Sequence, residues 1–427
     1  MRMKFNKSGQ LALVSAASLL VAALVTACGT LTVDFVFVTS SKAAGANNYG
    51  EVDVFEVNSE SGFMRQIPTS PFPSGGRNPV AEAVSSDNTN LYVVNQDDNT
   101  IVQFIIGNDG KLYPQNTTNT PGIYPLAVAV NGKNLFVVDT YQPLPSCSSA
   151  APCSGSVAVF PISANTTTPP SDALQPNTPI NACNGIDYVP LSLTGNASNH
   201  IVLPTAVNVL KSGSDLFISA YDTTASTGLV FGFSIGTLSC PNNPSPYQTI
   251  PTLTALKGSP WVAGIHPSAI ASDPSSAYVY VADSTSGNVL GYSIQSGALT
   301  PLGGSPFPAG DQPAAIAIDP AYPYLYVANT LDSTVTAYSM SSGALTRIGS
   351  YATGLQPVAI GIDPSTNHFL YTANFLGTTV NGTVSGFELS TTAGTLINSQ
   401  NSPYTANAQP TAIVGIPHNG PAAGAQK

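Results

Sequence analysis

The chain has 427 residues, of which 12 are Lys or Arg, 22 are Asp or Glu and only 8% are charged. An average soluble domain carries about 25% charged residues, so this composition excludes a helical enzyme with a charged surface. The net charge of −10 and the scarcity of cations exclude a nucleic-acid-binding protein. Because 43% of the residues are hydrophobic, the chain can fill a core and is not disordered.

The N-terminus has the pattern of a bacterial export signal. Three cations precede an apolar run of fifteen residues, 11–25, which is shorter than the ~20 residues of a membrane span. The following Leu-Val-Thr-Ala-Cys resembles a lipobox, which implies cleavage before Cys28 and a lipid on its thiol. We therefore expect a signal peptide (1–27), a lipidated tether (28–32) and a location in the cell envelope. An ordinary cleavable signal with an incidental cysteine is the alternative.

Cleavage at this point would leave 9 Lys or Arg against 22 acidic residues, a net charge of −13. Anionic lipid repels such a protein, so we expect its membrane contact to be the acyl anchor alone. We expect a monomer without a cofactor, and a neutral polar small molecule or an envelope protein as partner.

Four cysteines follow the lipobox: Cys147, Cys153, Cys183 and Cys240. Outside the cytoplasm an even number favours disulfides. Three pairings are possible, and proximity favours Cys147–Cys153 with Cys183–Cys240. A zinc site is the rival interpretation, but no histidine lies near these cysteines and their spacings fit no zinc finger, so no metal is predicted.

The tripeptide Pro-x-Ala recurs seven times, and each copy opens a short apolar stretch with β-strand alternation. Its prolines are Pro79, Pro125, Pro204, Pro267, Pro313, Pro357 and Pro410. A second strand has an aromatic residue at one aligned position: Phe37, Tyr92, Phe136, Phe217, Tyr280, Tyr326 and Tyr371. So does a third: Phe55, Phe104, Phe160, Phe233, Tyr292, Tyr338 and Phe387. A less regular fourth strand follows a Gly-x-Leu turn.

Four strands per unit and seven units predict an all-β protein, a seven-bladed β-propeller with four antiparallel strands per blade. The repeats begin with a second strand (34–38) and end with a first strand (410–416). The C-terminal strand should therefore complete the blade formed by the N-terminal strands, which covers both sheet edges. The predicted propeller spans 33–417 and precedes a flexible tail (418–427). Longer spacings between prolines predict insertions near 140–155, 165–200 and 237–262.

The second-strand sequences Tyr326-Val-Ala-Asn329 and Tyr280-Val-Ala-Asp283 resemble those of YVTN-repeat propellers. More broadly, the chain resembles the lactonase family, which includes bacterial 6-phosphogluconolactonase and fungal carboxymuconate cyclase. The resemblance implies a site at one mouth of the central channel, with Arg, His and Glu carried by Pro-Arg-His and by a Glu after the second strand. This sequence departs from both, because Pro-Arg-His is absent and Gln96, Thr140, Ser284, Thr330 and Phe375 stand where the Glu is expected.

The residues that precede the seven prolines should form a ring at the channel mouth, which we call the entrance ring. They are Asn78, Tyr124, Leu203, His266, Gln312, Gln356 and Gln409, with Arg77 beside the first. Planar hydrogen-bonding side chains suit a neutral polar ligand such as a sugar. The alternative is that they bind turn backbone and ordered water. Arg77 could instead clamp an anionic ligand or pair with Glu82.

The residues that end the second strands should form another ring, which we call the Asx ring: Ser40, Asn95, Asp139, Ala220, Asp283, Asn329 and Asn374. Asx side chains readily close turns, and this is the first interpretation. The alternative is that Asp139 and Asp283 act as a base or as metal ligands. His266 is a further candidate for a general base.

Three functional hypotheses follow. The first is a lipid-anchored propeller that binds a ligand or a protein through one face without catalysis. The second is a divergent lactone hydrolase, in which His266, Asp139 or Asp283 activates water. The third is a surface adhesin, which should carry clustered exposed aromatics on an outer face.

Overall fold

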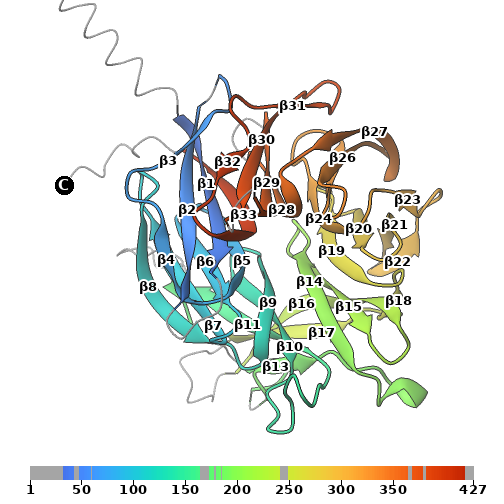
Figure 1. Cartoon of the computed structure of the whole chain (residues 1–427). Helices are drawn as coiled ribbons and strands as arrows, with labels where there is room; N and C mark the ends of the chain where they lie inside the picture. The colour runs from blue at the N-terminus through green and yellow to red at the C-terminus, as the bar shows by residue number, and fades with distance from the viewer. Residues whose placement is uncertain are drawn as a thin grey trace, which may run out of the picture.

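Seven antiparallel sheets surround a common centre in the computed structural model (Figure 1). The structure describes residues 32–42, 48–58, 60–163, 173–176, 179–183, 185–240, 249–363, 368–377 and 381–418. The predicted signal peptide, Cys28 and residues 419–427 lie outside this part of the chain. The sheets confirm the seven-bladed β-propeller, and we number the blades 1 to 7 in chain order.

The innermost strand of each blade begins at or just before a Pro-x-Ala motif. For blades 1 to 7 these strands are β33 (Gln409–Pro417), β5 (Pro79–Val84), β9 (Ile123–Val130), β14 (Val202–Val209), β19 (Pro267–Ser272), β24 (Pro313–Ile318) and β28 (Leu355–Ile362). The second strands are β1 (Thr32–Ser41), β6 (Asn90–Asn95), β10 (Asn134–Tyr141), β15 (Asp215–Asp222), β20 (Tyr278–Asp283), β25 (Tyr324–Asn329) and β29 (Phe369–Leu376). All six residues of β6 and of β25 are buried, because a blade packs against a neighbour on both faces.

The outer half of each blade is less regular. The third strands are β2 (Tyr49–Asn58), β7 (Thr100–Ile106), β11 (Ser156–Ser163), β16 (Thr227–Ser239), β21 (Asn288–Gln295), β26 (Thr334–Ser341) and β30 (Thr383–Leu389). The fourth strands are β3 (Met64–Gln66), β8 (Leu112–Asn119), β12 (Ala173–Leu174), β17 (Thr249–Ala255), β22 (Ala298–Pro301), β27 (Ala344–Ala352) and β31 (Leu396–Asn398). In five blades another short strand pairs with the third: β4 (Phe72–Arg77), β13 (Tyr188–Pro190), β18 (Trp261–Val262), β23 (Phe307–Pro308) and β32 (Tyr404–Thr405).

A Ser-Pro-aromatic sequence that the sequence analysis missed marks four of these breaks in the outer edge. In each copy the serine Oγ accepts a hydrogen bond from a backbone N–H in the middle of the third strand. The copies begin at Ser70, Ser259, Ser305 and Ser402, and the donors are Val54, Gly232, Gly291 and Gly386. The hydroxyl thus takes the place of a ladder partner where the fourth strand leaves the sheet.

The two ends of the described chain close the ring by pairing with each other. β1 and β33 are antiparallel neighbours, with Asp34 opposite Pro417 and Ser40 opposite Pro410 (Figure 1). This confirms the predicted closure. It also covers two sheet edges that would otherwise be open to intermolecular pairing.

Every Pro-x-Ala motif produces a β-bulge. The register with the second strand shifts between the proline and the alanine, so that the middle residue has no partner, as for Ala314 between Pro313 and Ala315. The same shift occurs in the other six blades. Bulges redirect the adjoining backbone and often lie beside functional sites. These seven lie next to the prolines that follow the entrance-ring residues.

Tyrosines of the second strands join neighbouring blades. Tyr280 Oη donates to the carbonyl of Gly343 over 2.7 Å, and Tyr326 Oη donates to Gly394 over 3.1 Å. Each acceptor lies in the turn before the fourth strand of the next blade. The aligned aromatics that marked the repeat therefore serve packing between blades, together with aliphatic contacts such as those of Tyr280 and Val289 with Leu325 and Val327.

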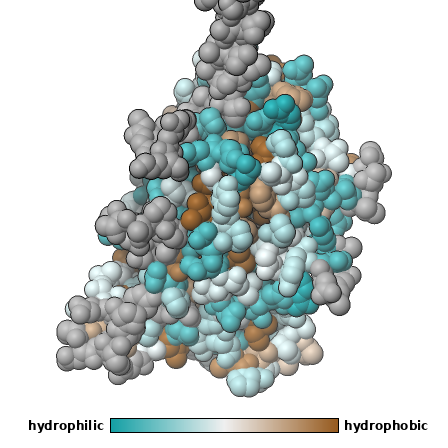
Figure 2. Space-filling view, turned by 90° about the vertical axis from the view of Figure 1, so that its left-hand side faces the viewer, coloured by the Kyte–Doolittle hydropathy of each residue, from teal (hydrophilic) through white to brown (hydrophobic). Residues whose placement is uncertain are grey.

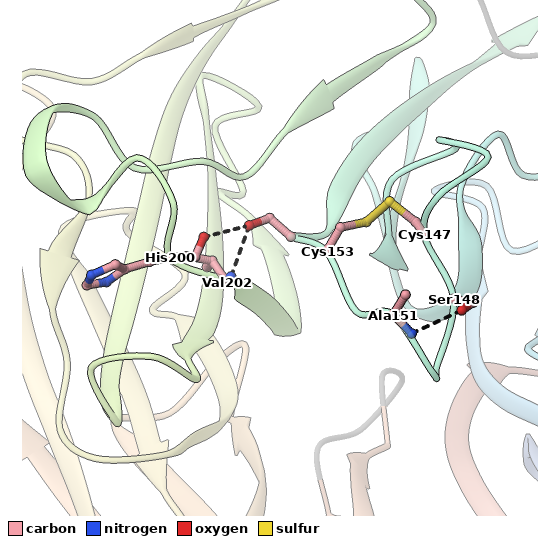
Figure 3. Close-up of a disulfide and its surroundings, with 7 residues drawn as sticks. Cys147, Ser148, Ala151, Cys153, His200 and Val202 are labelled. Atoms are coloured by element: carbon pink, nitrogen blue, oxygen red, sulfur yellow. Dashed lines mark hydrogen bonds between the residues drawn. A yellow bond between two sulfur atoms is a disulfide. The ribbon is translucent and has the colours of Figure 1, made fainter.

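Both expected disulfides are present, Cys147–Cys153 and Cys183–Cys240. The short Cys147–Cys153 loop is fixed to blade 4 through Ser154, whose Oγ donates to the carbonyl of His200 and accepts from Val202 N–H (Figure 3). The segment near 237–262, where an insertion was predicted, contains strand residues. Residues 237–239 extend β16 and 249–255 form its partner β17, so much of this segment is a long hairpin.

Hydrophilic residues cover most of the side shown in Figure 2, and hydrophobic residues reach the surface there in small groups. In the part of the chain that the structure describes, no helix has the length and apolar character of a membrane span.

Candidate functional site

The entrance ring and the Asx ring share one end of the propeller, as expected. In blades 2, 5 and 6 the residue after the second strand bonds to the entrance-ring residue of the same blade. Backbone N–H groups of Gln96 and Thr330 donate to the carbonyls of Asn78 and Gln312 over 3.0 and 2.9 Å. We call this end the ring face.

Four entrance-ring residues adopt the left-handed backbone conformation. Their φ angles are 51° for Asn78, 58° for Tyr124, 56° for Gln312 and 54° for Gln356. Glycine adopts this region freely, whereas each residue with a Cβ pays about 1 kcal/mol or more. Strained residues often occur at ligand-binding sites, so these four side chains are candidates for ligand contact.

Aromatic side chains surround the mouth on the side of blades 3, 4 and 5. The rings of Tyr124 and Tyr141 meet edge to face with their centroids 6.2 Å apart. The rings of Tyr221 and His266 are closer, at 4.4 Å with a tilt of 40°. Tyr124 and His266 were expected here from the sequence, whereas Tyr141, the last residue of β10, and Tyr221, the next-to-last residue of β15, were not.

The cations near the entrance ring form ion pairs with carboxylates. Arg77 Nη2 lies 2.5 Å from Asp98 Oδ1, and Lys42 Nζ lies 2.6 Å from Glu51 Oε2. The expected Arg77–Glu82 pair is wrong, because Asp98 follows the second strand of the same blade and reaches Arg77 first. Among the described residues of the ring face, no cluster of free cations is available to hold a phosphate.

Glu82 lies inside the blade interface. Its Oε2 accepts a hydrogen bond of 2.5 Å from Thr39 Oγ1, a residue of blade 1. Burial raises the pKa of Glu82 to about 8, although hydrogen bonds from Thr39 and the Val414 backbone lower it. The carboxyl is therefore largely protonated at neutral pH and links blades 1 and 2 as a neutral group.

The Asx ring closes turns. Asn329 Nδ2 donates to Thr334 and Thr336, and Asn374 Nδ2 donates to Thr383 and Ser385. A glycine packs directly on five of its members, Asn95, Asp139, Asp283, Asn329 and Asn374. These glycines extend the repeat motif to Gly-x-x-Pro-x-Ala.

Gly310 illustrates the fit. A Cβ at this position would lie 2.6 Å from Asn329 Cγ, so the approach requires glycine. Blades 1 and 4, which have Ser40 and Ala220 in the Asx ring, carry Asn407 and Ile201 at the glycine position. The glycine and the Asx side chain thus occur together, as parts of one turn.

Asp139 and Asp283 belong to blades 3 and 5 and bind separate sets of groups. Burial raises the pKa of Asp283. Hydrogen bonds from the backbone N–H groups of Ile265 and His266 and from the Ser286 hydroxyl outweigh burial and lower this pKa below the usual range, so Asp283 is ionised. Burial raises the pKa of Asp139 to about 7. In the described part of the chain, no three His, Cys, Asp or Glu side chains are arranged to hold a metal.

His266 contacts a serine rather than a carboxylate. Its Nδ1 lies 3.4 Å from Ser284 Oγ, and Asp283 binds only its backbone N–H. A histidine that the sequence analysis did not consider makes the carboxylate contact instead. His200 Nδ1 lies 2.7 Å from Asp222 Oδ2, a nearly buried side chain that also accepts from Thr224 and Ala225 N–H.

Six of the exposed large apolar residues lie at the ring face, in loops or at strand ends: Tyr49, Leu144, Val262, Ile265, Leu331 and Leu355. The adhesin hypothesis requires exposed aromatics that cluster on an outer face, and Tyr49 is the one aromatic residue among these six. Among the described residues these six gather instead around the end that carries the entrance ring.

Comparison with known proteins agrees with this geometry. The family model of the lactonase seven-bladed β-propeller matches residues 46–143 and 301–414. No curated protein sequence matches the chain significantly. Among solved structures, the chain is similar to the periplasmic gluconolactonase of Pseudomonas aeruginosa, with 18% identity, a TM-score of 0.65 and coverage of 90% of this chain and 99% of that one.

It is also similar to a candidate 6-phosphogluconolactonase of Bacteroides fragilis, with 20% identity and a TM-score of 0.67 over 90% of this chain and 98% of that one. These identities show a common fold. Together with the family model and the seven closed blades, they lead to one conclusion: the chain belongs to the lactonase family of seven-bladed β-propellers.

Proposed function

We propose that this protein is an exported, lipid-anchored binding protein that holds a neutral polar ligand, a carbohydrate, at the entrance ring and performs no chemistry on it. The observation that carries the proposal is the left-handed conformation of Asn78, Tyr124, Gln312 and Gln356. Further support comes from the aromatic pairs beside them. Aromatic rings pack against the apolar faces of sugars, and amides bind their hydroxyl groups.

The two disulfides support folding outside the reducing cytoplasm. In the proposed arrangement Cys28 carries the lipid. Ser40 lies at the ring face beside Pro410, so Asp34 and Pro417 lie at the opposite end of the same two strands. An anchor that precedes Thr32 would therefore turn the ring face away from the membrane.

Calorimetric titration of residues 29–427 with neutral mono- and oligosaccharides tests the binding function. The double variant Q312A/Q356A should bind at least tenfold more weakly, whereas Q295A, which removes an exposed glutamine at the other end of blade 5, should bind normally. Equal affinity of the wild type and Q312A/Q356A for every bound sugar would reject the entrance ring as the site.

Lactone hydrolysis is the second candidate function. It is favoured by the family and by the His200–Asp222 pair, in which a fixed carboxylate could orient a histidine base. In that case His200 Nε2 would accept a proton from the water that attacks the lactone carbonyl. Hydrolysis of neutral lactones by residues 29–427 that is lost in H200A or in H266A would support this candidate, and the absence of hydrolysis would reject it.

A further inference from the structure

A cavity lies in blade 1, at the ring-face end but outside the central channel. Its volume is about 310 Å³, at the lower end of small-molecule sites. Its walls include Tyr49 and Glu51 of β2, Phe72 of β4, and Lys42 at the end of β1. Tyr49 pairs with Arg77 in the sheet, so the cavity adjoins the entrance ring.

Glu51 is the chemical centre of this cavity. The residue is only 4% exposed, and Lys42 Nζ binds its Oε2. Its other oxygen, Oε1, is buried and has no hydrogen-bond partner among the described residues. A buried carboxylate oxygen without a donor is costly, and a ligand that supplies a hydroxyl or N–H would remove this cost.

The repeat shows that the fold does not need a carboxylate here. The residues aligned with Glu51 in blades 2 to 7 are Thr100, Ser156, Leu229, Asn288, Thr334 and Thr383. In blades 6 and 7 this threonine binds the Asx ring, as Thr334 binds Asn329. Blade 1 has Ser40 in the Asx ring and Glu51 in place of the threonine, so the carboxylate is an addition to the common architecture.

The other groups define the ligand. The Lys42 side chain is 44% exposed, and its ammonium has three donors, of which one binds Glu51. Tyr49 is 53% exposed and offers an aromatic wall. An acceptor, a donor and an aromatic surface, with their charges balanced, favour a neutral molecule that carries neighbouring hydroxyl groups on an apolar ring face.

We propose that this cavity binds one pyranose unit of a neutral saccharide, with a sugar hydroxyl that donates to the Glu51 carboxylate and another that accepts from Lys42. The inference rests on the proposed carbohydrate-binding function, because it names the class of ligand and adds a subsite beside the entrance ring. It needs no chemical step.

The probes are D-glucose, D-galactose, D-mannose and N-acetyl-D-glucosamine, titrated calorimetrically into residues 29–427. We expect at least one to bind, with affinity at least tenfold lower in E51Q and K42M. The matched control is E56Q. Glu56 lies on the same strand and forms an ion pair with Arg65 at a more exposed position, away from the cavity. Y49A tests the aromatic wall at an exposed position where folding is not at risk.

The proposal is overturned if none of the four sugars binds, or if E51Q and Y49A both bind like the wild type. The two proposals fail separately. Oligosaccharide binding that is lost in Q312A/Q356A but intact in E51Q would retain the entrance ring and reject the cavity. Monosaccharide binding that is lost in E51Q but intact in Q312A/Q356A would do the reverse.

Discussion

Thr39 Oγ1 donates a 2.5 Å hydrogen bond to Glu82 Oε2, and this contact joins blade 1, where the ring closes, to blade 2. The other six blades have Val or Ile at the position of Glu82: Val128, Val207, Ile270, Ile316, Ile360 and Ile413. At the junction of blades 1 and 2, one polar contact therefore takes the place of an apolar one.

We expect the stability of the protein to fall as pH rises from about 4.5 to about 8. Burial raises the pKa of folded Glu82 from its ordinary value of 4.5 to about 8, so the folded state holds a proton that the unfolded state has lost. Stability is thus full below the unfolded pKa and is lost as pH approaches the folded one. Asp53, raised to about 6, and Asp139, raised to about 7, act in the same direction.

Denaturant unfolding of the wild type and E82Q at pH 5 and pH 8 measures how much Glu82 contributes to this loss of stability. The glutamine does not titrate, so E82Q should reduce the loss of stability by about 2 kcal/mol or more. The double variant T39V/E82V introduces the valine pair that Val94 and Val128 provide between blades 2 and 3, and should show the same reduced dependence. An unchanged pH dependence in both variants would show that Glu82 titrates normally.

The second-strand tyrosines should differ in their sensitivity to loss of the hydroxyl. Y280F leaves the carbonyl of Gly343 without its donor and should cost about 1–2 kcal/mol of unfolding free energy. Tyr371 occupies the aligned position in blade 7, but its buried hydroxyl has no hydrogen-bond partner among the described residues. Y371F should therefore be neutral or stabilising, and a larger loss in Y371F than in Y280F would contradict this assignment.

The two disulfides should contribute unequally. They close loops with sequence separations of 57 and 6 residues, for which chain entropy gives about 4 and about 2 kcal/mol. C183S/C240S should therefore lower the melting temperature more than C147S/C153S does. The measurement is thermal unfolding of each double variant, with and without reductant. The opposite order would indicate that the Cys183–Cys240 segment contributes little to the folded ring.

The proposed lipid anchor on Cys28 predicts an orientation on the membrane, which can be measured in vesicles that contain a lipid-linked quencher. A tether of residues 28–32 spans at most about 14 Å, and β10 separates the two ends of blade 3 by roughly 26 Å. A fluorophore on K133C, at the end opposite the ring, should be quenched, whereas one on Q356C should not. Stronger quenching at position 356 would place the ring face toward the membrane.

Much of the fold could be predicted, because each blade repeats the same packing problem. The aligned aromatics and Pro-x-Ala motifs identified seven blades, and the order of strands identified the pairing of β1 with β33. The bulges were not foreseen, since Pro-x-Ala shows where a strand begins but not that its second residue leaves the register. The hairpin of β16 and β17 was missed because residues 237–262 are rich in Pro, Ser and Asn.

The site was less predictable, because its groups come from different blades. Sequence placed the entrance ring and the turn-closing Asx ring, each defined by its distance from a proline. It could not pair His200 with Asp222, or Lys42 with Glu51, because those contacts depend on loop paths. Arg77 shows the same limit, since its partner Asp98 is 21 residues away, beyond both β5 and β6.

The innermost strand of blade 1 is β33, the last strand of the described chain to be synthesised. While the ribosome is still making it, β1 has an open inner edge and the ring cannot close. The ring therefore closes only after the last of its seven blades has been made, and until then the inner edge of β1 is open to pairing with another chain.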